Sequence, residues 1–190
     1  MINRGSHPGR ASLFAAAAAA WLVYLAVDFL AHGVVLESWW RMTESSWLPP
    51  QTLLARIPLA YLSFAIYAVA VTWLLVNLVG PRPAILSGLG FGALAGCISG
   101  VWSVLSIYSV IPMPQASLLI WPVVAILESS AAGAAAAFIL RSASPWRRLI
   151  FVLLITLALF LLGVILQNRF FSTAPERIHS FSISTFRFFL

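Results

Sequence analysis

An acidic and a basic side chain lie four residues apart near the end of the first long apolar segment. Asp28 and His32 are separated by about one helical turn and therefore share one face of a helix. The segment from Ser12 to Leu36 rises by about 1.5 Å per residue as a helix, which is enough to cross the roughly 30 Å of hydrocarbon in a bilayer. An ionisable group at that depth costs about 3 kcal/mol. The pair therefore marks either a site for ions or protons or a contact that holds helices together.

Two further ionisable residues fall in apolar segments that follow. Arg56 stands in the first turn of the second segment, and Glu128 stands about halfway along the fourth. In an antiparallel bundle, Arg56 and Glu128 reach the same half of the membrane as Asp28 and His32. We therefore predict one intramembrane polar cluster that contains Asp28, His32, Arg56 and Glu128.

The interpretation that we favour for this cluster is mutual neutralisation, because a lone ion in an apolar interior either pairs or loses its charge. One alternative is a proton or ion relay through Asp28, His32 and Glu128. Another is a divalent metal held by the same three residues. The Glu-x-x-His pairs of di-iron bundles are absent and no cysteine joins the set, so we expect no metal. We also expect no haem or other cofactor, because His32 is the one histidine in an apolar segment.

The whole composition is that of a membrane protein. Hydrophobic residues make up 62% of the chain and charged residues only 8%, against about 25% in soluble domains. The pattern predicts an all-α polytopic transmembrane helix bundle, with four core helices and a fifth that faces lipid. The expected parts are a cytoplasmic N-terminal segment (1–11), a four-helix unit over 12–140 (helices 12–36, 52–79, 84–111 and 116–140), a fifth helix (149–166) and an interfacial or disordered tail (167–190).

Glycines recur at every fourth position of the third segment, a spacing typical of a glycine zipper. They are Gly88, Gly92, Gly96 and Gly100. Such a ridge lets a neighbouring backbone approach closely, which matters because lipid supplies no hydrophobic drive for helix association. We expect the partner to be the small-residue face of the fourth helix around Gly133, with homodimerisation as the alternative. Cys97, in the same segment, is expected to be a buried thiol.

The basic residues give an orientation. All eleven are arginines, scattered at the ends of apolar segments, which suits lipid headgroups and not the continuous basic face that nucleic acid requires. With the N-terminus in the cytoplasm, the inner segments hold Arg4, Arg10, Arg82, Arg141, Arg147 and Arg148. The positive-inside rule therefore predicts a cytoplasmic N-terminus.

Short motifs in the first four segments resemble a known group of proteins. Asp28-Phe29-x-x-His32-Gly33, the Pro112-Met113-Pro114 turn and a Glu128 in a small-residue helix are similar to those of the DUF1761-type bacterial membrane proteins of unknown function. The resemblance covers about residues 23–140. It implies a four-helix unit whose first and fourth helices contribute the polar residues, in a bacterial cytoplasmic membrane, and it implies no activity.

No catalytic motif accompanies the cluster, since the chain contains neither HExxH nor GxSxG. We therefore expect a non-enzymatic membrane protein, an accessory or assembly subunit with a buried polar cluster between its helices. The alternative is a small proton- or ion-coupled transporter that uses Asp28, His32 and Glu128. The expected partners are the lipid bilayer and either a second copy of the chain or a larger membrane complex.

Overall fold

The computed structural model describes residues 8–42 and 49–171, and helices make up most of these two ranges. The elements are α1 (Arg10–Leu30), which continues into the short π-helix η1 (Ala31–Val35), α2 (Glu37–Met42), α3 (Pro50–Leu78), α4 (Ile85–Tyr108), α5 (Ser117–Leu140) and α6 (Pro145–Phe171). Among the described residues, five helices are long and apolar enough to cross a membrane: α1 with η1, α3, α4, α5 and α6. The predicted all-α membrane bundle is confirmed.

The fifth span differs most from its expected bounds. It begins at Pro145 and ends at Phe171, a helix of 27 residues, whereas the sequence predicts a helix over 149–166. Proline fits the first turn of a helix because backbone N–H groups in that turn have no intrahelical acceptor. The N–H group that proline lacks therefore costs no hydrogen bond there. Residues 167–171 thus belong to α6 and not to the expected tail. The rest of that tail and most of the expected N-terminal segment lie outside the described residues.

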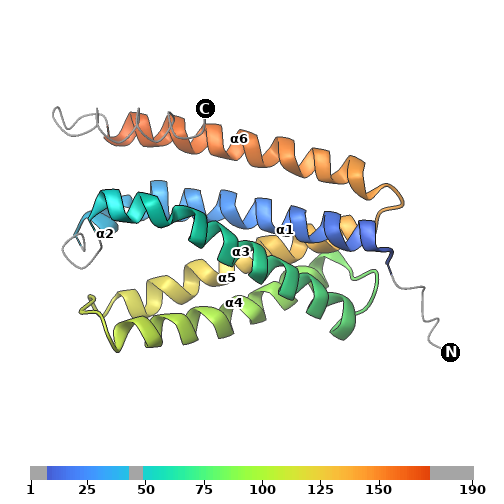
Figure 1. Ribbon diagram of the computed structural model, residues 1–190, viewed down its shortest axis with the longest axis horizontal. Coiled ribbons are helices and arrows are strands. Elements are labelled where there is room, and N and C mark those ends of the chain that lie inside the picture. Colours follow the sequence, from blue (N-terminus) through green and yellow to red (C-terminus); the bar gives the residue numbers. More distant parts are fainter. Residues whose placement is uncertain (1–7, 43–48, 172–190) are drawn as a thin grey trace.

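The long helices lie side by side and alternate in direction (Figure 1). α1 contacts α5, α6 and α3, while α4 packs most extensively against α5. The indole N–H of Trp21 in α1 donates to the Tyr61 carbonyl oxygen in α3 over 3.1 Å. α1 and α5 therefore form the centre of the bundle, and α6 and α4 cover them from opposite sides.

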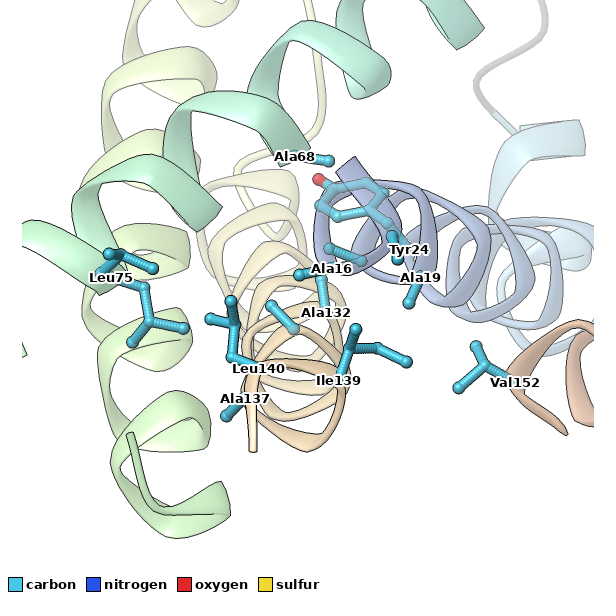
Figure 2. Close-up of a cluster of buried hydrophobic side chains, with 14 residues drawn as sticks. Ala16, Ala19, Tyr24, Ala68, Leu75, Ala132, Ala137, Ile139, Leu140 and Val152 are labelled. Atoms are coloured by element: carbon cyan, nitrogen blue, oxygen red, sulfur yellow. The ribbon is translucent and has the colours of Figure 1, made fainter. Parts of the chain in front are cut away.

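Small side chains form the centre of the α1–α5 contact (Figure 2). Five alanines of α1 and two of α5 are completely buried: Ala15, Ala16, Ala19, Ala20, Ala26, Ala136 and Ala137, of which Ala137 faces Gly88 of α4. Leu75 of α3 and Val152 of α6 are also buried in this cluster. This alanine-packed half of the bundle lies toward the end at which α1 begins and α5 finishes.

The glycine ridge of α4 faces α5 along its length. Gly88, Gly92, Gly96 and Gly100 are all buried. A Cβ atom on Gly92 would overlap the Ser129 carbonyl oxygen, and one on Gly88 would overlap that of Gly133. Glycine is therefore required at these positions by the close approach of the two backbones within one chain.

Cys97 is exposed on α4, so the expectation of a buried thiol is wrong. Gly96 faces α5, and the next residue on a helix is turned by about 100° from it. The glycine ridge thus directs the cysteine side chain toward the outside of the bundle.

We predict that Gly92→Ala destabilises the protein by about 1–3 kcal/mol, because the added methyl group must push the α5 backbone away. Gly90→Ala is the matched control, since a Cβ atom there meets nothing within 4 Å. Thermal unfolding in detergent, followed by circular dichroism, measures both. Equal midpoints for the two variants would contradict the close backbone contact.

Candidate functional site

Three ionisable side chains meet where the end of α1 passes the middle of α5. The Nε2 atom of His32 lies 3.6 Å from Asp28 Oδ1 and 3.5 Å from Glu128 Oε1. One ligand atom from each of the three residues lies within 4.8 Å of the others. Two helices far apart in sequence thus bring two carboxyl groups to one imidazole. We call Asp28, His32 and Glu128 the acid–histidine cluster.

The three residues differ in burial. The Glu128 side chain is only 5% exposed, whereas those of Asp28 and His32 are 25% and 28% exposed. Glu128 Oε1 is buried without a hydrogen-bond partner among the described residues. An unsatisfied buried acceptor costs about 1–3 kcal/mol. The nearest partner of this oxygen is His32 Nε2, at 3.5 Å, so the deepest polar atom of the acid–histidine cluster has an ion-pair contact but no hydrogen bond among the described residues.

His32 lies in η1, the π-helical turn that extends α1. The wider turn is closed by the Leu36 N–H, which donates to the Ala31 carbonyl oxygen over 2.8 Å. Single π-helical turns are rare and occur often at functional sites. Behind this turn, the Phe29 ring lies 5.1 Å from the Phe160 ring of α6. This aromatic contact holds α6 against the back of the site.

A tryptophan from α2 fixes the orientation of the imidazole. Trp40 Nε1 donates a hydrogen bond of 3.1 Å to His32 Nδ1, and the two ring centroids are 5.2 Å apart. Trp40 also meets Trp121 of α5 edge-on, at 5.7 Å between centroids. Because Nδ1 accepts this hydrogen bond, a neutral His32 carries its proton on Nε2. That N–H group faces the two carboxyl groups.

A line of hydroxyl groups continues from the cluster into the bundle. Tyr24, one turn before Asp28, interacts with Glu128 and packs edge-on against Tyr67 of α3, at 5.7 Å between ring centroids. The Tyr67 hydroxyl lies 3.0 Å from Ser129 Oγ and 3.3 Å from Ser99 Oγ. The polar groups thus connect α1, α3, α4 and α5, and beyond them begins the alanine-packed half.

Arg56 does not join the acid–histidine cluster. It is exposed, and within the described ranges it makes no ion pair with Asp28 or Glu128. The neighbouring residues 55–60 are exposed except for Ile57, so this end of α3 has few neighbours. A long arginine side chain near a helix end can reach the membrane surface and needs no buried partner.

Sequence reasoning did not include Tyr24 and Trp40 in the site. Tyr24 could have been found, because it precedes Asp28 by one helical turn on the face that also bears His32. Trp40 could not, because η1 and the start of α2 change the direction of the chain between it and His32.

Comparison of this chain with protein-family models, with curated proteins and with solved structures gives no match. The resemblance to the DUF1761-type proteins therefore stays a prediction.

We predict that Glu128→Gln leaves the free energy of unfolding unchanged or raises it. The substitution removes one of two acidic groups whose oxygens lie within 4.8 Å of each other, and like charges at that distance repel. Chemical or thermal unfolding in detergent measures the effect. A loss above about 3 kcal/mol, typical of breaking a buried ion pair, would instead indicate a structural ion pair.

We predict that Tyr67→Phe destabilises the bundle by about 0.6–1.7 kcal/mol, because the Tyr67 hydroxyl joins α3 to Ser129 and Ser99. Tyr108→Phe is the control, as Tyr108 is exposed at the end of α4. If both variants unfold alike, the hydroxyl network contributes nothing to helix association.

Proposed function

We propose that this protein is a small ion-coupled transporter of the bacterial cytoplasmic membrane and that the acid–histidine cluster is its ion-binding site. One observation carries the proposal: Glu128 Oε1 is buried, has no hydrogen-bond partner within residues 8–42 and 49–171, and lies 3.5 Å from His32 Nε2. In an apolar surrounding, an acceptor of this kind is stabilised by a cation that enters the site. A cluster that served only to join α1 and α5 would be expected to satisfy its own polar atoms.

The uneven burial of the cluster supports access from one side. Asp28 and His32 are partly exposed, whereas Glu128 is buried between them and the alanine-packed half. A carrier must not open to both sides of the membrane at once, because ions would then leak through it. Tight packing beyond the site is what a carrier closed on one side requires.

The distribution of arginines supports a direction for the entry of the ion into the site. Arg10, Arg82, Arg141 and Arg147 lie at helix ends that alternate in direction, so they gather at one end of the bundle. With that end in the cytoplasm, as the positive-inside rule requires, Asp28 and His32 lie toward the outer side. The site thus receives its ion from outside.

A second candidate function is that of an accessory or assembly subunit without enzymatic activity. The observation that favours it is the sparse packing of α3, whose main contact within the described chain is with α1. A span with so few neighbours offers room for a partner protein. Co-purification after mild detergent extraction, followed by mass spectrometry, tests this candidate, and an isolated monomer would count against it.

Ion flux in proteoliposomes tests the transporter directly. We expect the wild-type protein to dissipate an imposed cation gradient, as reported by an ion-sensitive dye inside the vesicles. Asp28→Asn and Glu128→Gln should each reduce the rate by at least about 10-fold, because each removes a charge that attracts the ion.

Thr156→Val serves as the control for this assay. Thr156 is a buried residue of α6 outside the acid–histidine cluster, and its hydroxyl has no hydrogen-bond partner in the described structure. The control should transport like the wild type. Wild-type flux no faster than that of empty vesicles, or equal flux in all variants, would refute the proposal.

A further inference from the structure

The geometry of the acid–histidine cluster points to a particular class of ion. We infer that the site binds a divalent transition-metal ion of the Zn²⁺ class through Asp28 Oδ1, His32 Nε2 and Glu128 Oε1. The role of this metal as cargo or coupling ion rests on the proposed function, whereas its binding does not. Familiar ligand spacings are absent from the sequence, which therefore predicts no metal; the folded chain assembles the ligands from two helices instead.

The separations between the ligand atoms fit such a site. Bonds of about 2.0–2.2 Å from a tetrahedral Zn²⁺ to oxygen and nitrogen place neighbouring ligand atoms about 3.3–3.6 Å apart. His32 Nε2 lies 3.6 Å from Asp28 Oδ1 and 3.5 Å from Glu128 Oε1. One oxygen of each carboxyl group lies within 4.8 Å of the other. Three protein ligands leave a fourth position open for water and for exchange of the ion.

The charges select the same class of ion. Two carboxylates carry the charge that a divalent cation cancels, so the occupied site is neutral in the apolar interior. An imidazole nitrogen suits zinc, copper, iron and nickel, whereas magnesium and calcium prefer six or more oxygen ligands. Glu128 Oε1, which accepts no hydrogen bond from the part of the chain that the structure describes, belongs to a side chain that is 5% exposed and supplies the deepest ligand. The partly exposed Asp28 and His32 lie where the ion enters.

Trp40 opposes metal binding in the present arrangement. Its indole N–H donates to His32 Nδ1, which leaves the imidazole proton on Nε2. A metal on Nε2 requires that proton to lie on Nδ1, where it would face the Trp40 N–H, donor against donor. Trp40 therefore has to turn away when the metal binds. The site thus contains a positioning residue that competes with its ligand.

Metal titration of the full-length protein in detergent tests the inference. After removal of metal by a chelator, we expect one Zn²⁺ per chain by calorimetry, and one Co²⁺ per chain with the visible absorption of a tetrahedral site. Asp28→Asn, His32→Gln and Glu128→Gln should each weaken binding by at least about 100-fold, more than the loss of a group that only orients a ligand. Thr156→Val should bind like the wild type. Absence of binding to the wild type, or binding that survives all three ligand substitutions, would overturn the metal site.

Trp40→Phe provides a second test, because its expected result is tighter Zn²⁺ binding and a misfolded protein would not bind more tightly. It keeps an aromatic ring beside His32 but removes the competing N–H donor. We expect Zn²⁺ to bind about 3- to 10-fold more tightly, the equivalent of one hydrogen bond. Unchanged or weaker binding would overturn the assignment of Nε2 as the metal ligand.

The two proposals fail in different ways. Zn²⁺ binding in detergent without ion flux in proteoliposomes would retain the metal site and remove the transporter. Flux of protons or sodium ions by a protein that does not bind Zn²⁺ would retain the transporter and remove the metal site.

Discussion

The close contact between α1 and α5 is the constraint on which the rest of the structure depends. In a bilayer, helices gain little from hiding apolar side chains from lipid, so their association rests on packing and on polar contacts. Ala16 and Ala20 of α1, and Ala136 of α5, are completely buried, which shows how near the two helices come. One or two turns further along, the same proximity places Glu128 beside Asp28. Larger side chains at the alanine positions would separate the helices and disperse the cluster.

The outer helices α4 and α6 stabilise the contact between α1 and α5. α4 approaches α5 through its glycine ridge, in which Gly92 lies against the backbone of Ser129. On the other side, α6 meets α1 where Phe29 packs on Phe160 and on the surface of Gly163. Both contacts lie close to the acid–histidine cluster along the helices. A displacement of either outer helix would therefore change the separation of the two carboxyl groups.

Polar and apolar packing divide the bundle into two halves. Toward the end at which α1 begins and α5 finishes, the contact is made largely by alanines. Toward the other end, two carboxyl groups, an imidazole and several hydroxyl groups share a small volume, and Glu128 Oε1 still has no hydrogen-bond partner among the described residues. Such a local departure from complete hydrogen bonding is typical of functional sites, where a ligand supplies the missing partner.

The sequence by itself determined the class of protein and the approximate places of its five spans, though not the bounds of the fifth, because long apolar segments bounded by proline and arginine can only be satisfied as helices in lipid. It also identified Asp28, His32 and Glu128, since ionisable residues stand out in such segments. The tertiary structure decided which of them meet. Arg56 is as conspicuous in the sequence as Glu128, but it lies at the sparsely packed end of α3, whereas Glu128 is carried to His32 by the α1–α5 contact. Trp40 joined the site only through the turn that follows η1. Helical periodicity predicts which residues of one span share a face. Which residues of different spans meet depends on packing that no local pattern encodes.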